Sequence, residues 1–149
     1  MYSYGHRNPQ GLTWLPDGRM YASEHGNRAN DEINLIEAGQ NYGWPVIQGT
    51  EEQEGMKAPL FTSGGDTTWA PSGMDYHHET LYVAALRGSA LLAFDLAAGK
   101  RQTVVSELGR IRDVRVEDGF LYFIGNNSDG RGMPQEQDDK LYRIKLADE

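Results

Sequence analysis

The chain has 149 residues, enough for about one domain, and its formal net charge of −8 disfavours nucleic acid and anionic membrane surfaces as partners. The absence of cysteine excludes disulfides, thiolate metal ligands and a cysteine nucleophile. No apolar run of about 18 residues predicts membrane insertion, and no signal peptide is recognisable after Met1.

The hydrophobic residues recur mainly at every second position, a period typical of β-strands, and 18 glycines supply turns. In the first part of the chain this pattern predicts strands at 12–14, from Met20 and over 33–36. The turn Pro16-Asp17-Gly18 joins the first two of them. A candidate fourth strand lies over 56–62.

The same pattern returns twice along the chain. Strands are predicted in the second unit at 74–76, 81–83, 91–96 and 102–106, and in the third unit at 114–116, 121–124 and 141–146. Up-and-down strands that repeat every 40–60 residues or so are typical of four-stranded antiparallel propeller blades. We therefore expect residues 1–149 to be all-β and to form one partial propeller domain of about three blades.

Three blades do not close a ring, because closed propellers have about 4–8 blades. The first and last blades would each expose a large apolar face, which monomers rarely tolerate. The chain is therefore expected to be either part of a larger propeller or a half-ring that pairs with another half.

One polar motif precedes the first predicted strand. In a propeller, the loop that enters the innermost strand of a blade lies at the mouth of the central channel. Arg7 offers a planar fork for carboxylates, and the amides of Asn8 and Gln10 add donors and acceptors. A solvated turn accounts for these residues about equally well.

A second motif, at 23–32, combines the turn residues Gly26 and Asn27 with the carboxylates of Asp31 and Glu32. Backbone carbonyl and carboxylate oxygens are ligands of Ca²⁺, so this loop is a candidate calcium site. On chemistry alone, a solvated acidic loop is the favoured alternative.

Arginines start the third unit. Arg110 and Arg112 alternate along one strand and therefore share a face, and Arg87 holds the comparable place one blade earlier. Either a bound anion or Asp113 is expected to balance these cations. The loop 126–132, rich in glycine and Asx residues, is more typical of a turn than of a ligand site.

Taken together, these motifs are more specific than any one of them. The segments 5–11, 24–26, 31–34, 41–45, 110–113 and 127–132 occur in this order. The string resembles the soluble PQQ-dependent sugar dehydrogenases, the family of aldose sugar dehydrogenase and soluble glucose dehydrogenase. The resemblance runs through essentially the whole chain and implies the C-terminal half of a six-bladed propeller.

The resemblance also implies ligands. It implies that PQQ contacts Arg7, Asn8, Gln10, Thr68, Arg87, Arg110 and Arg112. It implies one calcium ion on the main-chain oxygens of Gly26 and Asn27, and a second, structural calcium ion at Glu32 and Tyr42. Arg87 stands where the family usually has lysine, and Asn27 where many relatives have proline.

The family's catalytic base is a histidine in the N-terminal half, so no catalytic residue is assigned in this chain. We expect a partial PQQ-dependent aldose dehydrogenase with little or no activity alone, a homodimer that completes the six-bladed ring, and a periplasmic or secreted location. The alternatives are a non-catalytic binding module and a calcium-dependent hydrolase such as a lactonase. The arginines favour PQQ, because it has three carboxylates to neutralise and a lactone has none.

Overall fold

The computed structural model describes residues 1–147, which form eleven strands and no helix. The first sheet contains β1 (Pro9–Trp14), β2 (Met20–Glu24), β3 (Glu32–Ile36) and β4 (Phe61–Thr62). The second contains β5 (Pro71–His77), β6 (Thr80–Ala85), β7 (Ala90–Asp95) and β8 (Lys100–Ser106). The third contains β9 (Ile111–Glu117), β10 (Phe120–Gly125) and β11 (Leu141–Lys145). Within residues 1–147 there is no helix of the length and hydrophobicity needed to cross a membrane.

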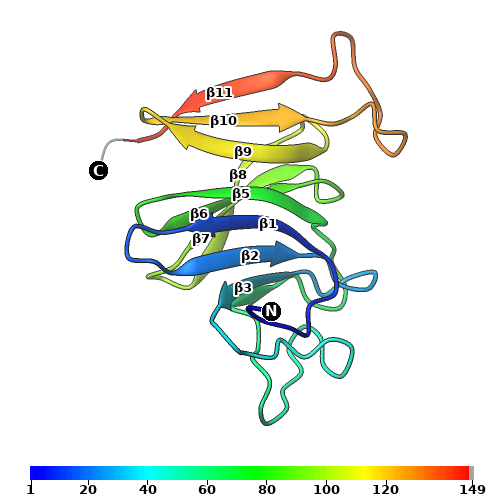
Figure 1. Cartoon of the computed structure of the whole chain (residues 1–149). Coiled ribbons are helices and arrows are strands. Elements are labelled where there is room, and N and C mark those ends of the chain that lie inside the picture. Colours follow the sequence, from blue (N-terminus) through cyan, green and yellow to red (C-terminus); the bar gives the residue numbers. More distant parts are fainter. Residues whose placement is uncertain (148–149) are drawn as a thin grey trace.

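Each sheet is an antiparallel blade whose strands follow one another in chain order, and this confirms the predicted all-β propeller architecture. The three blades succeed one another along the molecule (Figure 1), and the first strands β1, β5 and β9 contact each other in turn. The third blade has three strands in the described residues, so β11 forms its outer edge.

The fourth strand of the first blade is shorter than expected. The pattern predicts 56–62, but only Phe61–Thr62 pair with β3. Pro59 has no backbone N–H to donate to a sheet, and the loop before it is held elsewhere, with Lys57 N donating to Asn41 O. The strand therefore begins only after the proline.

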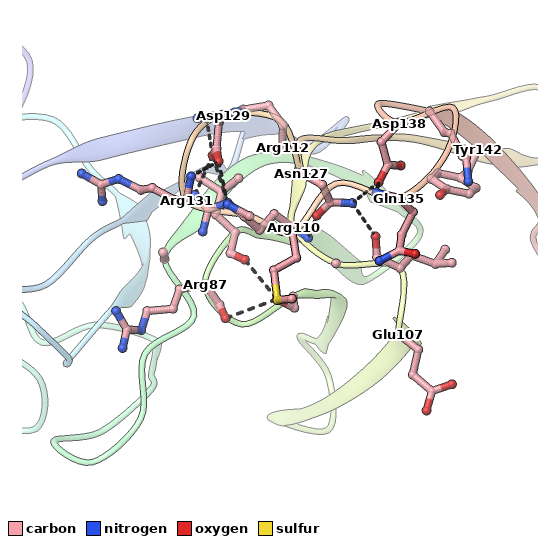
Figure 2. A pocket seen from close by; sticks show the side chains of 18 of the residues that line it. Arg87, Glu107, Arg110, Arg112, Asn127, Asp129, Arg131, Gln135, Asp138 and Tyr142 are labelled. Atoms are coloured by element: carbon pink, nitrogen blue, oxygen red, sulfur yellow. Dashed lines mark hydrogen bonds and ion pairs between the residues drawn. The ribbon is translucent and has the colours of Figure 1, made fainter.

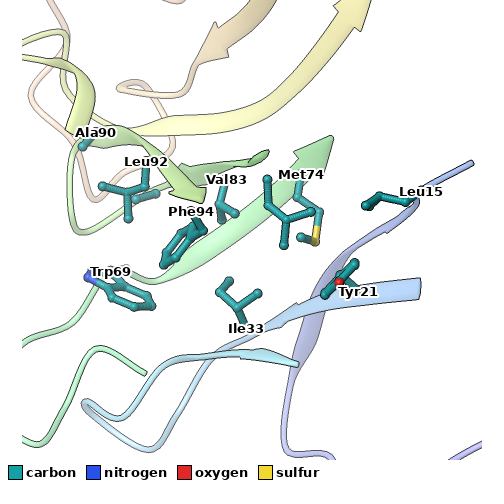
Figure 3. Close-up of a cluster of buried hydrophobic side chains, with 11 residues drawn as sticks. Leu15, Tyr21, Ile33, Trp69, Met74, Val83, Ala90, Leu92 and Phe94 are labelled. Carbon is teal, nitrogen blue, oxygen red and sulfur yellow. The ribbon is translucent and has the colours of Figure 1, made fainter. Parts of the chain in front are cut away.

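The hydrophobic core lies between blades. One cluster joins the first and second blades, as Figure 3 shows around Phe94 and Ile33. A second cluster joins the second and third blades and includes Leu91, Ile111 and Phe123. The middle blade is thus apolar on both faces, because each of its faces packs on a neighbouring blade.

The first blade has no such neighbour on its outer face. Leu12, Met74 and Val114 hold the same position in the first strands of their blades. Their partners on the second strands are Ala22, Val83 and Phe123, respectively. Met74 is 6% exposed and Val114 2% exposed because a preceding blade covers them, whereas Leu12 is 54% exposed. Trp14, two residues further along the same face, is also exposed.

The third blade, at the other end of the chain of blades, also exposes apolar side chains on its outer face. Ile124 and Leu141 are cross-strand partners on the outer face of the third blade, and both side chains are exposed. Each terminal blade therefore presents uncovered apolar side chains where the inner blades bury theirs.

Candidate functional site

A cavity of about 1210 Å³ lies where the first strands of the three blades begin. Its lining includes Asn8, Ala70 and Arg110, each of which directly precedes β1, β5 or β9. The antiparallel blades thus bring the three entering loops to one end of the molecule, although these loops lie far apart in the sequence.

Five of the seven residues predicted to contact PQQ line this cavity: Asn8, Gln10, Arg87, Arg110 and Arg112. The cavity is cationic. Arg131 and Lys140 join the three arginines, against the carboxylates of Glu107, Asp129 and Asp138, so five positive charges face three negative ones. In a chain with a net charge of −8, this is a local field that attracts anions.

The arginine pair at the start of β9 is balanced mainly by Asp129, not by Asp113. Figure 2 shows the Asp129 carboxylate against the Arg110 guanidinium, and Arg110 Nε donates to Asp129 Oδ2 at 2.9 Å. Asp113 instead accepts from Val114 N at 2.9 Å and lies against Gly73, where a Cβ atom would come within 1.7 Å of its Oδ1. Asp113 therefore packs against the neighbouring inner strand β5 and does not pair with the arginines.

Arg7 lies beside the large cavity and not in its lining. Its guanidinium sits 5.4 Å from the centre of the Trp44 ring, and its Nη1 donates to His25 O at 3.4 Å. Arg7, His25 and Gly26 line a small adjoining cavity of about 10 Å³, large enough for one water molecule or ion.

Thr68 lies in the lining of neither cavity. Its hydroxyl donates to Asp31 Oδ2 at 3.0 Å, and Asp31 also accepts from the backbone N–H groups of Gly26, Trp69 and Ala70. The buried Asp31 carboxylate thus ties the loop of the predicted calcium carbonyls to the loop that enters β5.

Several oxygen-bearing side chains line the cavity of about 10 Å³. Glu32, Tyr42 and Gln48 line it together with Gly26, and the buried Oε1 of Gln48 has no hydrogen-bond partner. Burial raises the pKa of Glu32. Hydrogen bonds donated by Asn34 Nδ2 at 3.1 Å and Gly49 N at 3.2 Å lower this pKa and offset part of the increase. An orphaned oxygen beside a desolvated carboxylate suits a hard cation such as Ca²⁺.

Two metal predictions find less support in the geometry. The Tyr42 hydroxyl donates to Leu35 O at 2.6 Å and accepts from Glu37 N at 2.8 Å, so it is already engaged in two hydrogen bonds within the protein. Asn27 is exposed and lies outside the lining of the small cavity. Among residues 1–147, no group of three or more His, Cys, Asp or Glu side chains is placed to hold a metal.

If a cation binds at Glu32, Ca²⁺ should raise the melting temperature of the wild type by several degrees. Saturation at 100 times Kd is worth about 2.7 kcal/mol. Glu32→Gln should abolish the shift. In EDTA its stability should stay close to that of the wild type, because removal of a desolvated charge offsets the loss of one of the two hydrogen bonds from Asn34 and Gly49. Glu54→Gln, in an exposed loop, is the matched control and should keep the shift. Differential scanning calorimetry decides, and an equal shift in Glu32→Gln would contradict the site.

Two residues of the site escaped the sequence analysis. Asp129 lies in the 126–132 loop, whose composition predicts a turn, and its carboxylate contacts Arg110, 19 residues away in the sequence. His25 lines the large cavity, and its Nε2 donates to Pro71 O at 2.6 Å, which fixes the first blade's loop on β5. Arg110 and Arg112 need a negatively charged partner, and the carboxylate in the 126–132 loop is the sequence feature that could have pointed to Asp129.

Comparisons with known proteins agree with this geometry. The family model for glucose/sorbosone dehydrogenases matches residues 1–143. The aldose sugar dehydrogenase of Escherichia coli is 32% identical over 155 residues, which are 87% of this chain and 42% of that protein. The quinoprotein glucose dehydrogenase B of Acinetobacter calcoaceticus is 51% identical over 55 residues, 37% of this chain and 12% of that protein.

A solved structure gives the same result. The PQQ-bound aldose sugar dehydrogenase of Streptomyces coelicolor superimposes with a TM-score of 0.90 and 36% identity over 97% of this chain and 45% of that one. The chain therefore spans less than half the length of the relatives it matches.

Proposed function

The chain belongs to the glucose/sorbosone dehydrogenase family, and from this premise we propose that it is the cofactor-binding part of a PQQ-dependent dehydrogenase that oxidises an aldose sugar. The observation that carries the proposal is the cationic cavity at the start of the three inner strands. PQQ is a tricarboxylate, and guanidinium groups bind carboxylates with paired hydrogen bonds. When bound, PQQ would accept the hydride from the sugar.

The cavity offers donors on three blades. Arg110 and Arg112 supply guanidinium groups from the third blade, and Arg87 supplies one from the second. On the first blade, Gln10 Nε2 donates to Asn8 Oδ1 at 2.8 Å, which fixes these two amides together at the cavity wall. These groups would hold the carboxylates, and the carbonyl of Gly26 would face an activating Ca²⁺.

We further propose that the chain alone oxidises aldoses slowly or not at all. The resemblance assigns the family's catalytic base to a histidine of the N-terminal half, and neither His6 nor His25 belongs to that motif. His25 Nε2 is bonded to Pro71 O, and His6 lies between Glu24 at 3.0 Å and Ser3 at 2.8 Å. A positioned general base is worth about 10²–10⁴-fold in rate.

Two further parts of the proposal concern the assembly. A second copy would supply the other half of the six-bladed ring, because the terminal blades carry uncovered apolar faces. The location would be periplasmic or secreted, as implied by the resemblance to the soluble PQQ-dependent sugar dehydrogenases.

The test is a PQQ titration followed by absorbance in the presence of Ca²⁺. Arg112→Ala should weaken binding by about tenfold or more, because a hydrogen bond to a charged group is worth about 1.5–3 kcal/mol. Lys100→Ala removes one positive charge from the outer strand β8 and should bind PQQ like the wild type. Equal affinity in Arg112→Ala would contradict the site assignment.

The same samples separate the alternatives. No PQQ binding by the wild type would favour a non-catalytic module, and lactone hydrolysis that depends on Ca²⁺ but not on PQQ would favour a lactonase. Added aldose and an artificial electron acceptor should give no turnover. Turnover at an ordinary enzyme rate of about 1–10³ per second would show that a residue of this chain serves as the base.

A further inference from the structure

Arg110 is held on one edge by a single carboxylate. Asp129 Oδ2 accepts from Arg110 Nε at 2.9 Å, and the same oxygen lies 2.8 Å from Arg110 Nη2. The two side chains cover each other and are 13% and 14% exposed, although the loop residue Asp129 as a whole lies at the surface. The pair is charge-assisted and has two short contacts to one carboxylate oxygen, which distinguishes it from a single-contact surface ion pair.

Asp129 is itself anchored by the loop that carries it. Its Oδ1 accepts from the backbone N–H groups of Arg131 at 2.9 Å and Gly132 at 3.1 Å. The pKa of Asp129 lies below its usual range, mainly because of the hydrogen bond from Arg131 N and also because of the Arg110 guanidinium and Gly132 N. Asn127 Oδ1 accepts from Arg110 N at 2.9 Å, so the backbone of Arg110 is fixed as well.

Arg112 is held by the same loop. Its Nη2 lies 3.9 Å from Asp129 Oδ2. The amide of Asn126, with its oxygen toward Arg112, accepts from Arg112 Nη2 at 2.6 Å and from Nε at 2.8 Å. The loop from 126 to 132 therefore contacts both guanidinium groups that line the cavity.

The arrangement leaves donors free. A guanidinium carries five N–H groups, and Asp129 engages Nε–H and one N–H of Nη2 on Arg110. Three N–H groups of Arg110 stay available to a ligand in the cavity. Without the carboxylate, the two guanidinium groups would repel each other and the Arg110 side chain would lose the acceptor that orients it.

We propose that Asp129 is a positioning residue that holds Arg110, and screens it from the neighbouring Arg112, in the orientation in which Arg110 binds a carboxylate ligand. The inference rests on the proposed function for the identity of that ligand as PQQ. For the removal of Asp129, the proposal predicts a change in anion affinity opposite to the one that Coulomb attraction alone would give. Removal of Asp129 makes the cavity more positive, so Coulomb attraction alone would tighten the binding of an anion, whereas loss of positioning weakens it.

The first experiment compares Asp129→Asn with Glu107→Gln by calorimetric titration with PQQ and with citrate, a simple tricarboxylate. Glu107 lines the same cavity and is exposed, so Glu107→Gln removes the same charge without freeing the arginines. We expect Asp129→Asn to bind both ligands about three- to tenfold more weakly, because binding must then immobilise the Arg110 side chain. Glu107→Gln should bind as tightly as the wild type or more tightly. Equal or tighter binding by Asp129→Asn would overturn the proposal.

The second experiment needs no ligand and so separates this inference from the proposed function. In ¹H–¹⁵N spectra of the wild type, Arg110 Nε–H should give a resolved signal protected from exchange, identified by its loss in Arg110→Lys. Asp129→Asn should lose this signal, and its persistence would overturn the proposal even if PQQ fails to bind. If Asp129→Asn does not fold, Asp129→Ser keeps a small acceptor for the loop N–H groups, removes the charge and should show the same loss.

Discussion

Light scattering should give a particle of twice the 16.7 kDa mass of one chain, and Trp14→Glu should convert it to the monomer. The reason is the geometry of the terminal blades. In the two contacts inside the chain, the face of one blade packs on the next and buries residues such as Met74 and Val114. Leu12 and Trp14 hold the corresponding face of the first blade, and both are more than half exposed.

The uncovered face is concave as well as apolar. A cavity of about 640 Å³ lies over it, lined by Leu12, Trp14, Met20 and Ile36 among others. The third blade offers Ile124 and Leu141 on its own outer face. A two-fold axis would seat the third blade of each copy on the first blade of the other, so the contact forms twice and the ring closes.

The size of the effect follows from this symmetry. Each contact should resemble a cut core, with a total buried area of about 2,000 Å² or more. One Trp14→Glu substitution places two desolvated carboxylates in the dimer, one at each contact. Thr103→Glu adds a carboxylate to the exposed outer strand β8 of the middle blade, which belongs to neither terminal blade, and this variant should stay dimeric. A folded wild-type monomer, or dissociation of both variants alike, would contradict the closed ring.

Replacement of Asp31 by alanine should lower the free energy of unfolding by about 3–5 kcal/mol. Asp31 is 2% exposed, and its carboxylate accepts from Thr68 Oγ1 and from three backbone N–H groups. Its loss leaves these donors without their acceptor in a site that water reaches poorly. At about 2–4 °C per kcal/mol, the melting temperature should fall by roughly 10 °C.

Asp66→Ala is the matched control, because Asp66 is an exposed carboxylate in the connection between β4 and β5, which also carries three of the donors to Asp31. Its stability should stay within about 0.5 kcal/mol of the wild type. Asp31→Asn keeps the shape but turns an amide N–H toward donors, so most of the loss should remain. A change below about 1 kcal/mol in Asp31→Ala, measured by urea unfolding, would show that the surrounding loops find other acceptors.

The amino-acid sequence by itself determined the strands and their order. A period of two and turn pairs such as Asp17-Gly18 and Asp118-Gly119 act over a few residues, so they can be recognised without knowing the fold. The same locality explains the failure at 56–62, where pairing depends on whether a distant strand, β3, accepts the segment.

The sequence also pointed to the loops that build the site, since residues that precede a blade's first strand must meet at one end of a propeller. Only the tertiary structure decided what each side chain does there. Arg7 turns to Trp44, Thr68 is bonded to Asp31 from 37 residues away, and Asp129 reaches Arg110 across 19 residues. These partners are chosen by contacts between loops that the sheets bring together, and no local pattern encodes such distances.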